Sequence, residues 1–261
     1  RAVQPLIGKL VAIKILSRKL SGDPQMVSRF VAEARAVNQI QSKNIVDIFG
    51  FGALPDGRQY FVMELLTGLT LEDFVRQRGR VPVEEAMPIF RAIARALDAA
   101  HAADIVHRDL KPENVFLVAD DEERLMPKLL DFGIAKLMGG ATGGHKTRTG
   151  VPMGTPYYMS PEQCRGDKID LRTDVYSFGV LAFQVLTGAL PFAGESFMQI
   201  MFAHVSSAPP VPSSVLPGLG TTLDAPILQM LAKAPGERPA SCGAAVEALA
   251  AAARDAGHQV G

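Results

Sequence analysis

A polar run of eight residues between two apolar stretches constrains this chain more than any other feature of its sequence. The run reads His-Arg-Asp-Leu-Lys-Pro-Glu-Asn over residues 107–114, and apolar residues flank it at 105–106 and 115–118. Flanks of this kind anchor a polar loop against a core. Seventeen residues after Asn114, the triplet 131–133 (Asp-Phe-Gly) adds another carboxylate beside a glycine. Acidic groups and a carboxamide are therefore expected to converge.

These groups suit phosphoryl transfer. One carboxylate can orient a hydroxyl group and accept its proton, and a second carboxylate with an amide oxygen can hold Mg²⁺ on phosphates. Asp109 fits the first role, and Asp131 and Asn114 fit the second. A lone Asp-Phe-Gly triplet often occurs by chance, whereas two motifs in this order and spacing favour a catalytic site over a structural coincidence.

The same residues resemble the catalytic and magnesium loops of eukaryotic-type (Hanks-type) serine/threonine protein kinases, here of bacterial character. The resemblance runs from residue 1 to about 253. It implies an α+β, two-lobed protein-kinase-like fold, with a small β-sheet N-lobe carrying one helix at 1–66 and a larger, mainly helical C-lobe at 67–261. It places the catalytic loop at 107–114 and the activation segment at 131–162.

A lysine inside an apolar segment extends the resemblance into the N-lobe. Residues 9–16 predict a buried strand with Lys14 in its middle, and Glu33 follows in a predicted helix at 26–40. The resemblance implies that Lys14 pairs with Glu33 and holds the phosphates of ATP. Taken alone, Lys14 would more often be an edge-strand lysine whose ammonium reaches solvent. The position of Glu33 and the downstream motifs favour phosphate binding.

Two further strands are predicted at 45–51 and 59–65, and the segment that follows resembles the kinase hinge. The resemblance implies that backbone groups of the hinge bind the adenine edge of ATP, which assigns Glu64 and Leu66 to the nucleotide site. Met63 then occupies the gatekeeper position, although plain core packing explains this methionine equally well.

Helix signals dominate after the hinge. Thr70 is a candidate N-cap with acidic residues in the next turn, and residues 83–103 have the length and alanine content of a long buried helix. Shorter alanine-rich helices are predicted at 223–231 and 242–253.

The resemblance assigns further roles near the catalytic loop. Lys111 would neutralise the transferring phosphoryl group. His107 and Phe132 would join Val37 and Ile48 in a column of stacked apolar side chains.

It also assigns roles in the C-lobe scaffold. Glu162 would form a buried salt bridge with Arg238. Asp174 would cap the long apolar helix that follows it and would brace the backbone of the catalytic loop. Ser160 stands where the family has alanine, a small-for-small change expected to matter little.

The activation segment is the predicted place of regulation. Its middle is rich in glycine and threonine, and phosphate on Thr147 or Thr149 could order it through Arg108. A flexible loop with unmodified threonines is the alternative. Thr155, which would hydrogen-bond near Asp109, is a choice typical of serine/threonine kinases, as is the lysine of the catalytic loop.

Composition limits the partners and the environment. The 261 residues carry 27 basic and 27 acidic side chains, so no bulk charge favours nucleic acid. The two cysteines are far apart and lack neighbouring ligand pairs, which argues against a disulfide framework or a zinc site. No membrane segment or signal peptide is visible, and a cytoplasmic location is expected.

One required part of the family pattern is missing, because no glycine-rich phosphate loop precedes Lys14. We therefore expect an N-terminally truncated catalytic domain that exposes a sheet edge and binds ATP poorly.

The predicted function is transfer of the γ-phosphate of Mg·ATP to serine or threonine hydroxyls of proteins, with self-phosphorylation in trans. The alternatives are an inactive pseudokinase scaffold and a small-molecule phosphotransferase. The long threonine-bearing segment disfavours the last, since a small acceptor needs no peptide platform.

Overall fold

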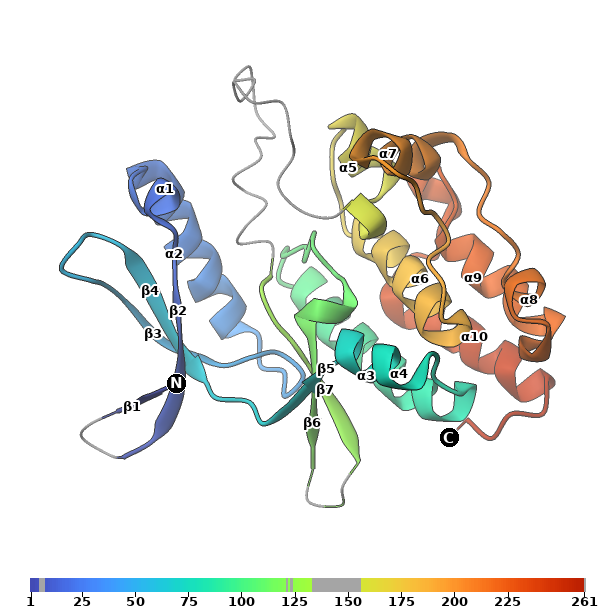
Figure 1. Cartoon of the computed structure of the whole chain (residues 1–261), viewed down its shortest axis with the longest axis horizontal. Coiled ribbons are helices and arrows are strands. Elements are labelled where there is room, and N and C mark those ends of the chain that lie inside the picture. Colours follow the sequence, from blue (N-terminus) through green and yellow to red (C-terminus); the bar gives the residue numbers. More distant parts are fainter. Residues whose placement is uncertain (5–7, 121, 123, 133–155, 261) are drawn as a thin grey trace.

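The computed structural model describes residues 1–4, 8–120, 122, 124–132 and 156–260, without the side chains of residues 19, 20, 24, 26, 29, 30 and 33 (Figure 1). The first part of the chain forms an antiparallel sheet in the order β1-β2-β4-β3. Its strands are β1 Ala2–Val3, β2 Leu10–Ile15, β3 Ile48–Ala53 and β4 Gln59–Glu64. Two helices, α1 Arg18–Ser21 and α2 Pro24–Gln39, lie between β2 and β3 in the chain.

The helices of this first part differ from the single helix that was predicted. Gly22 and Pro24 separate α1 from α2, because proline is favoured in a first helical turn and cannot continue a preceding helix. Ala34 of α2 packs with Ile48 and Phe61, which attaches the helix to one face of the sheet. Among the described residues, β1 pairs only with the first two residues of β2.

The rest of the chain combines a second antiparallel sheet with helices. The sheet has the order β5-β6-β7, with β5 Gly68–Thr70, β6 Val115–Ala119 and β7 Leu125–Leu129. The helices are α3 Leu71–Arg78, α4 Val83–His101, α5 Pro161–Arg165, α6 Arg172–Thr187, α7 Phe197–Ser206, α8 Pro212–Val215, α9 Asp224–Met230 and α10 Cys242–Asp255. Short 3₁₀ turns occur at Pro112–Asn114, Pro156–Tyr158, Pro217–Leu219, Thr221–Leu223 and Pro235–Glu237.

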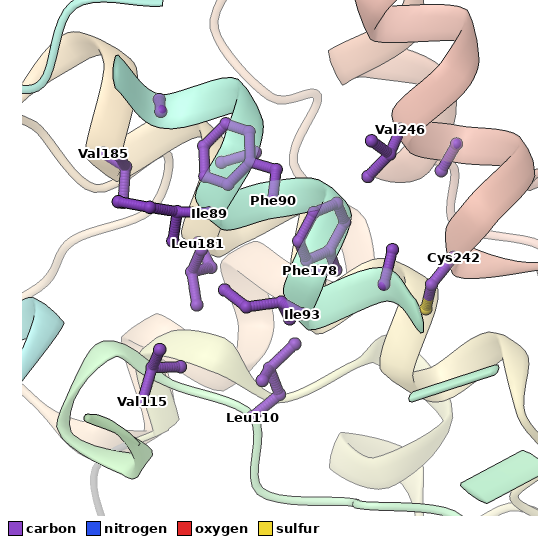
Figure 2. Close-up of a cluster of buried hydrophobic side chains, with 14 of the residues drawn as sticks. Ile89, Phe90, Ile93, Leu110, Val115, Phe178, Leu181, Val185, Cys242 and Val246 are labelled. Carbon is purple, nitrogen blue, oxygen red and sulfur yellow. The ribbon is translucent and has the colours of Figure 1, made fainter. Parts of the chain in front are cut away.

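Helix α6 lies at the centre of the main core. Thirteen of its sixteen residues are buried, as expected of a helix surrounded on all sides. Figure 2 shows side chains of α4, α6 and α10 pointing toward one another, with the rings of Phe90 and Phe178 edge to face at 5.6 Å. A Cβ on Gly179 would lie 2.7 Å from the Cβ of Met230, so glycine permits the close approach of α6 and α9.

A short segment after α2 ties the first sheet to the second. The Asn44 side-chain amide donates to the Pro127 carbonyl at 2.8 Å, and the backbone N–H of Val46 donates to the Leu129 carbonyl at 3.0 Å. Strand β7 leads directly to Asp131, so this connection sets the position of that carboxylate relative to β2. The α+β architecture with a sheet-rich first part and a mainly helical second part confirms the predicted fold class. None of the described helices combines the length and the apolar character needed to cross a lipid bilayer.

Candidate active site

The buried carboxylate of Asp174 braces the catalytic loop. Its two oxygens accept the backbone N–H groups of His107 at 2.7 Å and Arg108 at 2.8 Å, and Oδ2 also lies 2.7 Å from His101 Nε2. The predicted helix cap is wrong, because α6 begins at Arg172 after an uncapped Leu171 and Asp174 is its third residue. The carboxylate instead accepts hydrogen bonds from the loop N–H groups, which would otherwise be buried donors without acceptors.

The backbone of the site adopts conformations that non-glycine residues rarely take. Arg108 has a φ of 65° and Asp131 a φ of 52°. Such strain persists where surrounding contacts hold it. At Arg108, Asp174 holds the N–H, and the side-chain amide of Gln163 donates to the carbonyl at 2.8 Å. The peptide groups on both sides of Arg108 are therefore fixed by two distant segments.

Asn114 and Lys111 position the Asp109 carboxylate. Asn114 Nδ2 donates to Asp109 Oδ2 at 3.0 Å and to the Asp109 carbonyl at 2.8 Å. Lys111 Nζ lies 3.3 Å from the same Oδ2, and both charged side chains keep about a fifth of their surface exposed. The carboxylate is thus oriented by an amide and an ammonium while it stays accessible to a substrate hydroxyl.

Lys14 and Asp131 form an ion pair between β2 and the segment after β7. Lys14 lies opposite Phe61 in the β2–β4 register, and its side chain is 45% exposed. Glu33 belongs to α2, but its side chain lies outside the described part, so the predicted Lys14–Glu33 pair stays a prediction. The cation and the carboxylate assigned to phosphate and metal binding already meet in the structure.

His107 and Phe132 pack against each other beneath the loop, with ring centroids 4.6 Å apart. His107 Nε2 lies 3.0 Å from the Leu130 carbonyl, and burial lowers the pKa of this histidine, which favours the neutral ring. Val37 belongs to the same buried cluster as Phe132. Ile48 packs with Ala34 of α2 and with Phe61 in a separate small cluster, so its predicted place in the column stays a prediction.

The predicted hinge residues lie at the end of β4 and just beyond it. The Glu64 carboxylate accepts the Asp47 N–H at 2.8 Å and binds Lys128 Nζ at 2.5 Å, so its side chain ties β4 to β7. Met63 packs beside the small cluster of the first sheet, and Leu66 is partly buried between β4 and β5. Their assignment to the nucleotide site stays a prediction.

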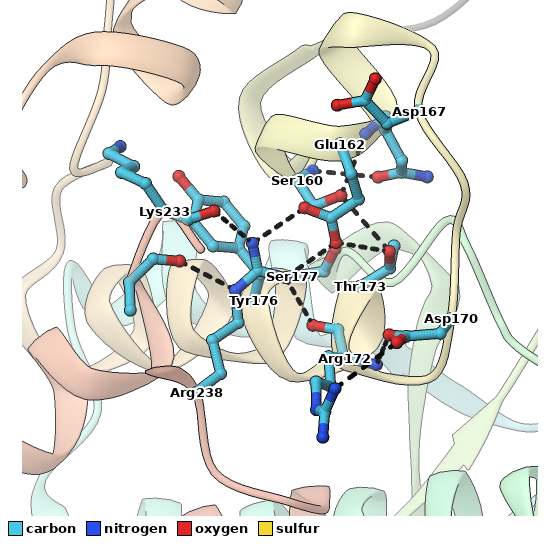
Figure 3. A network of polar contacts seen from close by, with 12 residues as sticks. Ser160, Glu162, Asp167, Asp170, Arg172, Thr173, Tyr176, Ser177, Lys233 and Arg238 are labelled. Atoms are coloured by element: carbon cyan, nitrogen blue, oxygen red, sulfur yellow. Dashed lines mark hydrogen bonds and ion pairs between the residues drawn. The ribbon is translucent and has the colours of Figure 1, made fainter. Parts of the chain in front are cut away.

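The ion pair between Glu162 and Arg238 is present and buried (Figure 3). Arg238 donates through Nη1 to Oε1 at 2.7 Å and through Nη2 to Oε2 at 2.8 Å. Thr173 Oγ1 also donates to Oε1 at 2.7 Å. Although burial raises the pKa of the Glu162 carboxyl, the bonds from Arg238 and Thr173 outweigh it and hold that pKa below its ordinary value.

Ser160 and Gln163 form a reciprocal cap at the start of α5. Ser160 is the N-cap of α5, where its Oγ accepts the Gln163 N–H and the Gln163 side chain accepts the Ser160 N–H. The serine therefore has a structural role here that the expectation of little effect did not include. A serine followed three residues later by glutamine is the signature of a capping box and could have revealed the role.

The three predicted regulatory threonines, Thr147, Thr149 and Thr155, lie outside the described residues. Thr70, by contrast, lies within the described residues. It is the N-cap of α3, as predicted, and its hydroxyl accepts the Asp73 N–H at 3.0 Å.

Comparison with curated proteins reveals relatives along almost the whole chain. It is 45% identical over 245 residues to serine/threonine-protein kinase Pkn1 of Myxococcus xanthus. The matched region covers 93% of this chain and 34% of that relative. It is 40% identical over 252 residues to serine/threonine-protein kinase PknE of Mycobacterium tuberculosis, at 95% and 43% coverage. PknL of the same species is 38% identical over 254 residues, at 96% and 61% coverage. The chain thus spans only part of these relatives.

Solved structures and a family model also match this chain to protein kinase domains. The crystal structure of the PknI kinase domain of Mycobacterium tuberculosis superposes with a TM-score of 0.72 at 28% identity, covering 93% of this chain and 85% of that chain. The model of the protein kinase domain matches residues 1–250. With the carboxylates, amide and lysines arranged as described, the chain belongs to the protein kinase domain family, alongside bacterial serine/threonine-protein kinases.

Proposed function

We propose that this chain is the catalytic domain of a serine/threonine protein kinase, which transfers the γ-phosphate of ATP to serine or threonine hydroxyls of protein substrates. The observation that carries the proposal is the Asp109 carboxylate, oriented by Asn114 at 3.0 Å and accompanied by Lys111 at 3.3 Å. The names of the curated relatives support the same activity. We keep the boundary between an N-lobe and a C-lobe after residue 66 as part of this proposal.

Asp109 would act on the acceptor. Its carboxylate receives a hydrogen bond from the substrate hydroxyl, orients the oxygen toward the γ-phosphorus and accepts the proton as the new P–O bond forms. Lys111 would place its ammonium beside the phosphoryl oxygens, where negative charge accumulates during transfer. As the bond between the γ-phosphorus and the bridging oxygen breaks, its electron pair leaves with ADP on that oxygen.

Lys14 would bind ATP, the phosphate donor. Its ammonium pairs with Asp131 in the structure, and a nucleotide phosphate can share that cation because the pair is open to solvent. Met63, Glu64 and Leu66 would contribute the adenine end of the site through the backbone of the hinge. Glu33 would orient Lys14.

The oxygen atoms available on Asp131 and Asn114 fit Mg²⁺. Asp131 offers carboxylate oxygens, and Asn114 uses its Nδ2 on Asp109, which leaves the amide oxygen as the ligand atom. Oxygen donors of this kind are the ones that Mg²⁺ prefers. When bound, the ion would neutralise charge on the phosphates.

Regulation through the activation segment belongs to the same proposal. Arg108 stands beside Asp109 with a backbone fixed by Asp174 and Gln163, so a phosphate on Thr147 or Thr149 that bound its guanidinium would be coupled to the catalytic loop. Self-phosphorylation in trans would supply that phosphate. Thr155 would bind near Asp109. Use of ATP and two free cysteines are consistent with a cytoplasmic location.

The test is phosphate incorporation from labelled Mg·ATP into the chain and into a generic protein substrate. We expect Asp109→Asn to lower transfer by about 10²–10⁴-fold while Mg·ATP binding stays nearly unchanged. The matched control is Asp104→Asn, the same change at an exposed residue whose φ of 59° asparagine accepts. Mg·ATP binding without transfer by the unaltered chain would favour the scaffold alternative, and equal activity of Asp109→Asn would refute the role of Asp109.

A further inference from the structure

A group of metal-ligating side chains lies away from the proposed active site, where α4 meets α10. Asp98 and His101 are three residues apart on α4 and therefore share one helix face. Cys242 is the first residue of α10, and Figure 2 shows it beside α4. One ligand atom from each of the three residues lies within 4.8 Å of the other two. A carboxylate, an imidazole and a thiol thus lie close enough together to be candidate ligands of one ion.

His101 is oriented for a ligand on one nitrogen. Its side chain is 6% exposed, and Nε2 lies 2.7 Å from Asp174 Oδ2. The Asp174 carboxylate can only accept a hydrogen bond, so Nε2 is the donating nitrogen and Nδ1 is the nitrogen that can offer a lone pair. That Nδ1 is buried and makes no hydrogen bond within the described part of the chain. Metal-binding histidines are commonly held in this way, with a carboxylate on the nitrogen that does not bind the ion.

Asp98 is fixed by the start of α10. Its carboxylate oxygens accept the N–H groups of Cys242 at 3.1 Å and Gly243 at 2.9 Å. A Cβ at position 243 would lie 2.5 Å from Asp98 Oδ2, so glycine makes room for the carboxylate. Asp98 is partly exposed, which opens the group to solvent on one side.

Cys242 adds a sulfur that is fully buried. Burial, followed by the carboxylates of Asp174 and Asp98, raises the pKa of its thiol. A bound divalent cation would take this sulfur as a thiolate ligand and balance the negative charge that the two carboxylates bring to this junction.

We propose that Asp98, His101 and Cys242 bind a zinc ion. Sulfur, nitrogen and oxygen donors together suit Zn²⁺, whereas Mg²⁺ prefers oxygen alone. Three protein ligands leave a fourth tetrahedral position for water on the exposed side. The ion joins α4 to α10 and holds the His101 tautomer that donates to Asp174, the residue that braces the catalytic loop. Local cysteine spacing does not reveal this group, because 144 positions separate Asp98 from Cys242.

The test uses Co²⁺ as an optical substitute for Zn²⁺, with the metal-free chain in saturating Mg²⁺ so that oxygen-only sites are filled. We expect one equivalent of Co²⁺ to bind with a thiolate-to-cobalt charge-transfer band, and Zn²⁺ to abolish the band by displacement. Cys242→Ser should lose the band. Cys164→Ser, at the other free cysteine, should keep it.

A second variant covers the case in which Cys242→Ser does not fold. Asp98→Asn retains an oxygen that accepts hydrogen bonds but loses the charge, and it should weaken Co²⁺ binding by about 10-fold or more. Absence of the band in the unaltered chain, its persistence in a folded Cys242→Ser variant, its loss in Cys164→Ser, or unchanged affinity in Asp98→Asn would overturn the proposal. None of these readouts depends on phosphate transfer.

Discussion

Asp174 illustrates how single residues organise this molecule. One buried carboxylate accepts two loop N–H groups and faces His101, so the catalytic loop and α4 both converge on α6 at this residue. The Glu162 carboxylate plays a comparable part nearby, with Arg238 and Thr173 as its partners. Buried charges of this kind are stable only as complete sets, because a partner left alone is an uncompensated charge.

Replacement of Glu162 by glutamine tests that dependence. Arg238 would remain buried and charged, and we expect a loss of roughly 3–5 kcal/mol in the free energy of unfolding at pH 7. The folded-state pKa of Glu162 lies below its ordinary 4.5, so its contribution is complete above that pH and declines as pH falls through the folded-state pKa. Denaturant titrations across pH should therefore show the two proteins converging in acid. Glu237→Gln, at an exposed neighbour, should stay within about 0.5 kcal/mol at every pH.

Helix α5 illustrates the element scale. It has only five residues, so capping contributes much of what defines it. Ser160 and Gln163 supply a reciprocal cap, Pro161 occupies the first turn, and Gly166 ends the helix in the left-handed conformation. Because Gln163 also donates to the Arg108 carbonyl, the cap contributes to the position of the catalytic loop.

Ser160→Ala should destabilise the chain by about 1 kcal/mol, since the Gln163 N–H loses its acceptor. Ser160→Thr retains the hydroxyl and should recover part of the loss. Urea unfolding measures the difference, with Ser206→Ala at an exposed position as the matched control. Equal stability of the alanine variant and the unaltered chain would mean that the cap contributes nothing.

The whole molecule depends on contacts between the first sheet and β7. Asn44 is 3% exposed and donates to the Pro127 carbonyl, and Glu64 binds Lys128 from the neighbouring strand. These contacts place β2 with Lys14 opposite the end of β7 with Asp131.

Asn44→Ala removes one of these contacts and leaves a buried carbonyl without its donor. We expect a loss of about 1–3 kcal/mol, with faster hydrogen exchange in β7 and in the neighbouring first sheet. Asn38→Ala, at an exposed position of α2, is the control and should leave exchange in β7 unchanged. Unaltered exchange in Asn44→Ala would show that the connection rests on the remaining contacts alone.

The amino-acid sequence alone was sufficient for features whose chemistry is contained in a short segment. The catalytic loop, the Asp131 triplet and the lysine strand each place their functional groups within a few residues, so order and spacing predicted the candidate site. The family resemblance that these motifs carry predicted the fold class. The Thr70 cap was predicted from a local signature, whereas the Glu162–Arg238 pair, whose members are 76 positions apart, was predicted from the resemblance.

Tertiary packing, by contrast, sets which distant side chains meet. Asp174 acts on the catalytic loop rather than on its own helix end, and Asp98 reaches Cys242. Both outcomes depend on how α4, α6 and α10 pack around one core, which brings together residues 66 to 145 positions apart. Local periodicity reports which face of a helix is buried, but it carries no information on which partner that face will meet.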